Sequence, residues 1–362
     1  RRARLLLTRT LIMSGPIHFT PGNQQPRVSK EEWIELQQQC SLLTDVCSEM
    51  ARRWRLAGEP LNKTYPNWPQ TGTPDPYGGS FSWTAENLCN SDILTQNPLK
   101  FEDYIFPNGS AETMIWSSYR YGPGFNNIHV EPATFITKVR GKPHVAYVAF
   151  RGTQTKANGG LDLQYDQSPN PMDVLGGTVM KGFEKYFAGC GIKADGTRPA
   201  DSASVTVPGK TLYQSLKDIS YKHGGTVKDL IVTGHSMGST TAQLTGALAC
   251  KEGWFERVIV SCSASPRFGT AGFKTWYDQL RSEKPHHMLN DYTWRFTNRN
   301  DFVPKVPGAP YTEMGTEVWF EEKNGNEHNP CCTYSYAINN PDQTHNPNID
   351  TCVFPTPEIP PE

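Results

Sequence analysis

Two patterns of hydrophobic and polar positions alternate along the middle of the chain. Short apolar runs predict buried strands at 133–139, 144–150, 230–232, 257–262 and 292–297. Apolar residues three and four positions apart predict helices at 211–221 and 271–280, and small and apolar residues after position 238 suit a helix packed close to a sheet. Strands that alternate with helices favour right-handed βαβ units and a largely parallel central sheet.

The N-terminal part of this region adds a helix and a hairpin. Ser29 and Glu32 have the spacing of a capping box and predict a helix start. The helix is expected to bury one apolar stripe, formed by Trp33, Leu36, Cys40, Leu43, Cys47 and Met50. The strands at 133–139 and 144–150 flank a turn at 140–143 and therefore predict a β-hairpin. Residues 154–177 are polar and predict a long loop, which in a compact domain is usually functional.

Composition narrows the classes of protein and partner. The chain has 362 residues and a formal net charge of −1, which gives no reason to expect a nucleic-acid partner. No apolar run has the length that crosses a bilayer. None of the nine cysteines form a Cys-x-x-Cys pair, which favours disulfides over a zinc site. Together with two glycosylation sequons, at 62–64 and 108–110, the cysteines favour a secreted or extracellular protein. No metal or cofactor is expected.

The strand at 230–232 leads into Gly234-His235-Ser236-Met237-Gly238, a Gly-x-Ser-x-Gly nucleophile elbow between a strand and a helix. A serine on so tight a turn needs glycines beside it, because other side chains would clash. The following helix directs its unpaired N–H groups to the place where an oxyanion would form. Ser236 is therefore the candidate nucleophile.

A serine nucleophile needs a general base and a carboxylate that orients the base. After an elbow of this kind the acid comes next along the chain and the histidine last. Asp301 directly follows the strand at 292–297, at the end of the sheet where such sites are built. Asp278 falls on a helix and Asp291 precedes its strand, so both are expected to be surface carboxylates.

This chain order leaves two histidines for the base, His328 and His345, because only these follow a suitable acid. His235 lies inside the elbow beside the nucleophile, where its geometry as a base is poor. The residues alone do not choose between His328 and His345.

The sequence resembles the class 3 (fungal-type) lipases, whose fold is the α/β-hydrolase fold. The resemblance extends from Ser29 to Cys352 and rests on five segments in the family's order: 148–153, 181–183, 234–238, 265–273 and 297–307. It implies a mostly parallel central sheet with helices on both faces. It also implies a single lipase-like domain over 29–354. The basic residues at the start of the sequence indicate that 1–28 is an extension, disordered or a targeting remnant, and residues 355–362 are expected to form a Pro-rich tail.

The resemblance also assigns roles to residues. It implies Ser236 as nucleophile, Asp301 as orienting acid and His345 as base, with His328 as the alternative. Backbone N–H groups of Thr153 and Met237 would form the oxyanion hole. The family's histidine comes shortly before a cysteine that is often bonded to the N-terminal helix, which implies a Cys47–Cys352 disulfide. Asn346-Pro-Asn348 stands where the family has aromatic residues.

These features favour a serine carboxylic-ester hydrolase, first of all a triacylglycerol lipase that works through an acyl-enzyme, with an ester substrate at a lipid–water interface. The family's lid corresponds to 155–166, which is polar here and carries Gly159-Gly160, a pair unfavourable to a helix. That lid resembles the feruloyl-esterase branch, so an esterase for soluble or feruloyl esters is the alternative. The third hypothesis is an inactive binding protein of the same fold. Oligomeric state is not predicted.

Overall fold

The computed structural model describes residues 17–19, 28–56, 114–120, 128–139, 142–153, 165–169, 177–189, 205–206, 212–283, 287–346 and 352. Several expectations concern residues outside these ranges. They are the two sequons, the tail over 355–362, and most of the N-terminal extension and of the lid.

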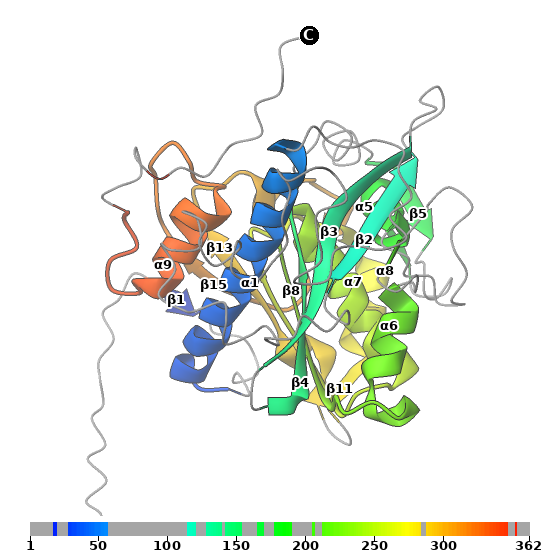
Figure 1. Cartoon of the computed structure of the whole chain (residues 1–362). Helices are drawn as coiled ribbons and strands as arrows, with labels where there is room; N and C mark the ends of the chain where they lie inside the picture. Colours follow the sequence, from blue (N-terminus) through cyan, green and yellow to red (C-terminus); the bar gives the residue numbers. More distant parts are fainter. Residues whose placement is uncertain are drawn as a thin grey trace, which may run out of the picture.

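A nine-stranded sheet forms the centre of the structure (Figure 1), and five neighbouring strands within it are parallel to one another. In spatial order these are β4 (Lys142–Phe150), β8 (Asp229–His235), β9 (Arg257–Ser263), β13 (Thr293–Asn298) and β15 (Thr316–Phe320). Strands at the two edges pair antiparallel: β3 (Ile128–Val139), β2 (Met114–Arg120) and β7 (Val205–Thr206) beyond β4, and β1 (His18–Phe19) on β15. The predicted strands and the β3–β4 hairpin are confirmed.

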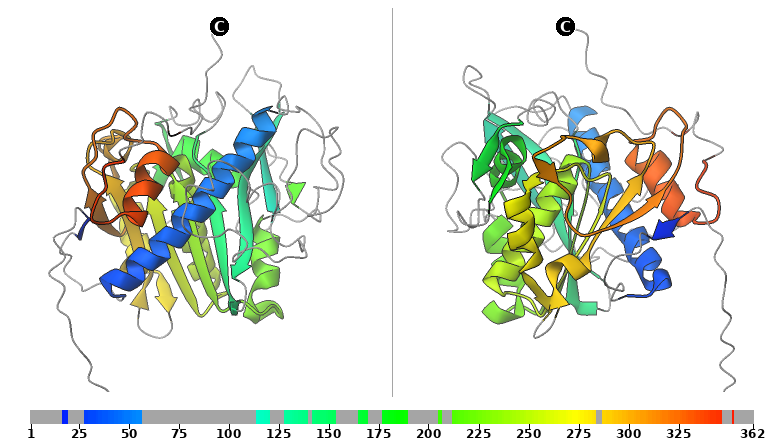
Figure 2. Two further views of the ribbon diagram at one scale, coloured as in Figure 1. Left: turned by 60° about the vertical axis from the view of Figure 1, so that its left-hand side comes forward. Right: turned by 180° about the vertical axis from the view of Figure 1, so that it is seen from behind.

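Helices cover both faces of this sheet. α1 (Lys30–Leu56) crosses one face diagonally with α9 (Tyr336–Asn339) beside it, as Figure 2 shows. Four helices cover the other face: α5 (Lys181–Gly189), α6 (Leu212–Ile219), α7 (Met237–Glu252) and α8 (Ala271–Asp278). The expected architecture, a parallel central sheet with helices on both faces, is confirmed.

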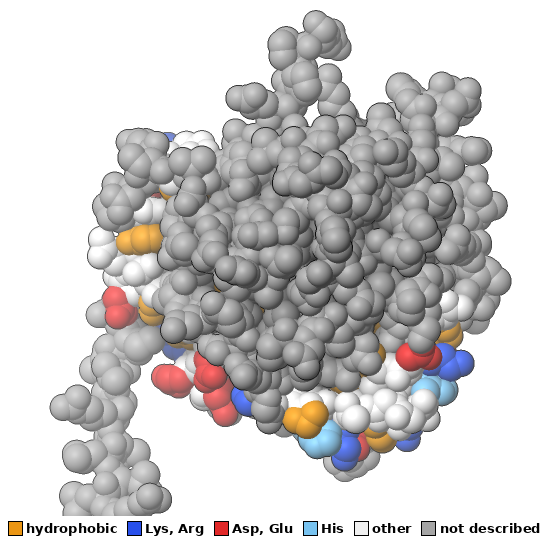
Figure 3. All heavy atoms as spheres, in the orientation of Figure 1, with side chains coloured by type: hydrophobic (Ala, Val, Ile, Leu, Met, Phe, Trp, Pro, Cys, Tyr) orange, Lys and Arg blue, Asp and Glu red, His pale blue; other side chains and the backbone are white. Residues whose placement is uncertain are grey.

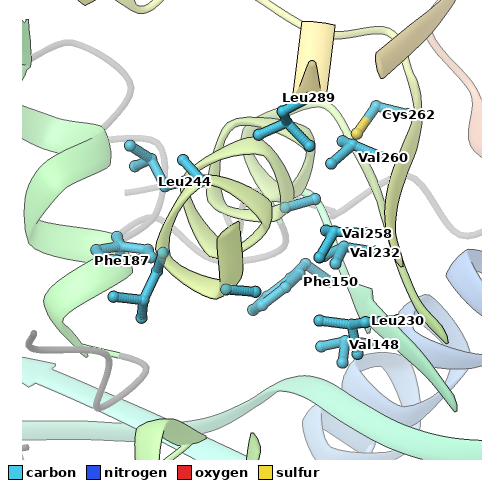
Figure 4. Packing of buried hydrophobic residues seen from close by; sticks show 14 of the residues in the cluster. Val148, Phe150, Phe187, Leu230, Val232, Leu244, Val258, Val260, Cys262 and Leu289 are labelled. Atoms are coloured by element: carbon cyan, nitrogen blue, oxygen red, sulfur yellow. The ribbon is translucent and has the colours of Figure 1, made fainter. Parts of the chain in front are cut away.

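Side-chain alternation along the parallel strands creates two cores. In β4, Val148 and Phe150 face the layer of α7, whereas Tyr147 and Ala149 face the layer of α1. Because both faces are covered, the strands are nearly continuous runs of buried residues. Figure 4 shows residues of the first core around α7, among them Val232 and Val260.

Shorter elements complete the fold. A second sheet has the order β14 (Tyr311–Thr312), β10 (Gly269–Thr270), β6 (Thr178–Met180) and β5 (Gln167–Pro169). β11 (Arg281–Glu283) pairs with β12 (His287–Met288), and a π-helix spans Pro330–Ser335. None of the described helices is long and apolar enough to cross a membrane. Acidic and basic side chains both occur along the lower edge of the face in Figure 3.

The start of α1 is as predicted, but its burial is not. The Ser29 amide donates to Glu32 Oε2 at 2.7 Å and the Glu32 amide to Ser29 Oγ at 3.1 Å, which is the expected capping box. Residues 41–48 are buried on every side of the helix rather than along one apolar stripe. The reason is that α1 lies between the sheet and the π-helix, so its polar side chains are buried as well.

Asp45 is one of these buried polar residues, 1% exposed. Its Oδ2 accepts a hydrogen bond from Ser335 Oγ at 2.6 Å, which joins α1 to the end of the π-helix. Burial raises the pKa of Asp45 to about 7, and the Ser335 bond opposes this only in part. The carboxyl is therefore protonated in the folded protein over a pH range in which an unfolded chain would ionise it.

Asp45 makes the free energy of unfolding fall as pH rises. The folded chain holds one proton more than the unfolded chain between the ordinary Asp pKa of 3.8 and about 7, so the stabilisation present below that range is lost across it. In the parent protein Asp45 lowers the free energy of unfolding by up to roughly 4 kcal/mol between these limits, and we expect this decrease to be absent in Asp45→Asn, whose side chain stays neutral. The free energy of unfolding in urea, determined for both proteins at pH 4, 6 and 8, measures the difference. Parallel pH profiles would contradict the prediction.

Candidate active site

The end of β8 turns sharply into α7, with Ser236 at the turn. Ser236 has φ 56° and ψ −128°, a region that residues other than glycine rarely adopt. A Cβ on Gly234 would lie 2.3 Å from the Gly238 carbonyl oxygen, and one on Gly238 would lie 2.3 Å from that of Arg151. Both glycines are therefore required by the close approach of α7 to β8 and to the end of β4. The predicted strand–turn–helix context of the elbow is confirmed.

The acid candidate lies at the same edge of the sheet. Asp301 comes three residues after β13, and its side chain is 1% exposed. Its Oδ1 accepts from the Val303 amide at 2.9 Å. Its Oδ2 accepts both from His328 Nδ1 at 2.7 Å and from the Tyr334 hydroxyl at 2.8 Å. A buried carboxylate needs such donors to offset the loss of its hydration.

His328 completes the arrangement. With Nδ1 donating to Asp301, the other ring nitrogen, Nε2, carries a lone pair, and it lies 2.9 Å from Ser236 Oγ. Nε2 can thus accept the serine proton. Two hydrogen bonds in series therefore join Asp301, His328 and Ser236, in the geometry that acyl-transfer catalysis by serine requires.

His345 is not at this place, contrary to the expectation from the family resemblance. Its Nδ1 lies 2.9 Å from Glu322 Oε1, and its side chain is 65% exposed. The physical reason is the course of the chain after β15: it places His328 beside Asp301, and it places His345 beside a second buried carboxylate, that of Glu322. A signal for His328 exists in the sequence: Tyr334 and Tyr336 follow it within eight positions, whereas no aromatic residue follows His345 within that distance.

Two side chains around the triad of Asp301, His328 and Ser236 were not found from the sequence. Burial, and then the neighbouring Asp301 carboxylate, raise the pKa of the Tyr334 phenol well above its ordinary value, so that it remains a donor. Asn298, which is fully buried, donates through Nδ2 to the carbonyls of Glu322 and Glu327 at 2.9 and 3.2 Å. It thereby fixes the segment before His328 to the end of β13.

His235 packs beside the triad. Its ring centroid lies 4.8 Å from that of His328 and 5.4 Å from that of Tyr334. Burial, followed by the charge of the neighbouring His328, lowers the pKa of His235 well below its ordinary value. A neutral His235 ring adds no positive charge beside His328 when that residue takes up a proton.

The expected oxyanion residues lie at the elbow. Met237 is the first residue of α7, and Thr153 comes three residues after β4. A Cβ on Gly152 would be 3.1 Å from Ser236 Cβ, so the segment before Thr153 passes directly beside the nucleophile candidate. This position suits backbone N–H groups that stabilise a negative oxygen.

One disulfide lies next to the triad, and its pairing differs from the expectation. Cys352 is bonded to Cys332, with a Cα–Cα distance of 5.9 Å, rather than to Cys47. Cys47 lies inside the second core, where its Sγ donates to the Ala149 carbonyl at 3.1 Å. The bridge joins the C-terminal segment to the π-helix that carries Tyr334.

Part of the chain is similar in sequence to known lipid hydrolases. Residues 147–311 match the family model of class 3 lipases, described as Lipase (class 3). The chain is 27% identical over 173 residues to "Galactolipase DONGLE, chloroplastic" of Arabidopsis thaliana, covering 46% of this chain and 34% of that protein. It is 27% identical over 124 residues to "Phospholipase A1-II 4" of Oryza sativa subsp. japonica, covering 33% and 29%. The alignments thus span about a third of each relative.

Two solved lipase structures align with most of the chain at low sequence identity. A fungal lipase in complex with an inhibitor is 17% identical with a TM-score of 0.47, covering 82% of this chain and 83% of that one. The nonglycosylated LIP2 lipase of Yarrowia lipolytica is 16% identical with a TM-score of 0.45, covering 81% and 80%. With the family match over 147–311 and the sheet described above, the expected resemblance to class 3 lipases and their α/β-hydrolase fold is confirmed.

Proposed function

We propose that this chain, which resembles the class 3 lipases over residues 147–311, is a serine carboxylic-ester hydrolase with Ser236, His328 and Asp301 as its triad. The observation that carries the proposal is the pair of hydrogen bonds from Asp301 through His328 to Ser236, 2.7 and 2.9 Å long. An inactive binding protein would have no need of a strained serine held in line with a base and a buried acid.

The first half of the proposed reaction forms an acyl-enzyme. Ser236 Oγ attacks the ester carbonyl carbon as its proton passes to His328 Nε2, and Asp301 stabilises the imidazolium. The backbone N–H groups of Thr153 and Met237 stabilise the negative oxygen of the tetrahedral intermediate. The intermediate then expels the alcohol, which takes the proton from His328.

The second half of the reaction releases the acid. His328 Nε2 removes a proton from water, and the resulting hydroxide attacks the acyl carbonyl of Ser236. The proton then returns through His328 to Ser236 Oγ as the carboxylic acid leaves. Tyr334 holds the same Asp301 oxygen that pairs with His328, which keeps the imidazole in one orientation through both halves.

For the substrate we propose glycerolipid esters, with triacylglycerol as the first candidate. A second candidate is a polar glycerolipid, favoured because the two curated relatives are named as a galactolipase and a phospholipase A1. Soluble or feruloyl esters remain the alternative from the polar lid, whose residues lie outside the described part of the chain. No cofactor or metal enters the proposed reaction.

We further propose a secreted or otherwise oxidising location, which the Cys332–Cys352 bridge supports because disulfides persist in such compartments. The expected result is that most of the protein in its native source is recovered outside the cells or within the secretory pathway. Immunoblotting of fractionated material measures this, and recovery in the reducing cytosol alone would contradict it.

The choice between histidines is tested by a matched pair of variants. We expect His328→Gln to lower kcat/KM for ester hydrolysis by roughly 10⁴-fold or more, as removal of a triad member does. His345→Gln is expected to leave it close to that of the parent protein, because His345 pairs with Glu322 instead. Ser236→Ala provides the background rate, and circular dichroism verifies folding. Loss of activity in His345→Gln alone would overturn the assignment.

The substrate class is tested by a panel of esters. It contains an emulsified long-chain triacylglycerol, vesicles of a galactolipid and of a phospholipid, a soluble short-chain ester and a feruloyl ester. We expect Ser236-dependent turnover of at least one glycerolipid to exceed that of the soluble and feruloyl esters, measured by fatty-acid release. Turnover confined to soluble or feruloyl esters would contradict the glycerolipid proposal and support the esterase alternative. No Ser236-dependent turnover of any ester would refute the enzyme proposal.

A further inference from the structure

A short apolar segment projects from the protein directly beside the candidate acid. We call residues 302–310 the acid-loop ridge. Asp301 directs its carboxylate inward and is 1% exposed, whereas the next residue, Phe302, is 70% exposed. Among the described residues the other exposed large hydrophobic side chains are Tyr165 at 49% and Met288 at 36%. The largest such exposure in the described chain thus adjoins the triad.

Hydrogen bonds hold the ridge in a fixed shape. The Val303 amide donates to Asp301 Oδ1 at 2.9 Å, and the Lys305 amide donates to the Phe302 carbonyl at 3.0 Å. The Arg267 amide donates to the Val306 carbonyl at 3.0 Å and ties the ridge to the segment before β10. An ordered backbone therefore presents the Phe302 ring to solvent, so the exposure does not result from a loose loop.

The composition of the ridge fits a lipid surface. Eight of its nine residues are apolar or glycine, and the exposed Lys305 carries its one charge. Insertion of an aromatic ring into the boundary of a lipid layer is favourable, and a nearby ammonium group remains at the level of the headgroups. A single cation close to the surface adds attraction to anionic lipids.

We propose that the acid-loop ridge is a docking surface for an anionic lipid–water interface, with Phe302 inserted among the lipids and Lys305 attracted by the net negative charge of the headgroup layer. This inference rests on the proposed function, because docking at the ridge would bring the ester substrate to Ser236. A second copy of the chain is a poorer occupant, since a stable protein interface buries about 800 Å² per partner and the ridge exposes a single large side chain.

Vesicle binding tests the proposal without any turnover. All proteins carry Ser236→Ala, and cosedimentation is measured with vesicles of phosphatidylcholine alone and of phosphatidylcholine mixed with phosphatidylglycerol. We expect Phe302→Ser to weaken binding to the mixed vesicles about tenfold, from the free energy of burying a phenyl group. Lys305→Gln is expected to weaken binding about fivefold on the mixed vesicles and to change nothing on phosphatidylcholine alone.

Met288→Ser is the matched control. Met288 is also an exposed apolar residue, but it precedes β13 whereas Phe302 follows it, so the two lie toward opposite ends of that strand. Its vesicle binding should equal that of the Ser236→Ala parent. Thermal unfolding followed by circular dichroism confirms that each variant is folded.

Three results would overturn the proposal. They are no binding of the parent to either vesicle, equal binding by Phe302→Ser, and equal losses in Phe302→Ser and Met288→Ser. Analytical ultracentrifugation adds a fourth: a dimer that dissociates in Phe302→Ser would assign the ridge to a second copy. Because these proteins have no nucleophile, failure of the ester-hydrolysis panel leaves the vesicle result standing, and a negative vesicle result leaves the triad proposal standing.

Discussion

The close approach of α7 to the end of β4 is the contact on which the candidate site depends. Only a residue without Cβ fits at position 238, because the Arg151 and Phe150 carbonyl oxygens would lie 2.3 and 2.6 Å from an added carbon. This contact places residues 151–153 against the elbow, where Ser236 has a positive φ of 56°. Such strain persists only where the surroundings determine the conformation. Here they do so through the core around α7, which is buried from Met237 to Ala249.

A second constraint is the hydration that Asp301 loses on burial. Its two oxygens accept three hydrogen bonds within the protein, and two of the donors, His328 and Tyr334, come from one segment after β15. Tyr334 in turn accepts from the Asn298 amide at 3.0 Å. Satisfying one buried carboxylate therefore fixes the position of the histidine as well. In the proposed mechanism Asp301 orients the base, and its hydrogen bonds also organise the loop that carries His328.

The parts of the fold that follow from local patterns were predictable from the sequence, and the parts set by long loops were not. Strand β8, the elbow and α7 are encoded within the 24 consecutive residues 229–252, so periodicity and the glycine spacing suffice. The choice between His328 and His345 depends on the path of the chain over 322–346. Both histidines follow Asp301 in sequence, and both meet a buried carboxylate. Spacing relative to Cys352 misleads here, because Cys352 bonds to Cys332 and not to α1.

Elements on both faces of the sheet support the candidate site. Parallel strands β4, β8 and β13 end at one edge of the sheet, and Thr153, Ser236 and Asp301 follow these ends. α7 supports the serine from one face, whereas the π-helix supports Asp301 from the other through Tyr334. The π-helix is itself held against α1 by the bond between Ser335 and Asp45. An apolar residue at position 45 would lack this hydrogen bond to Ser335, the residue next to Tyr334. The polar side chain at position 45 therefore belongs to the support of the triad, although it lies within the second core.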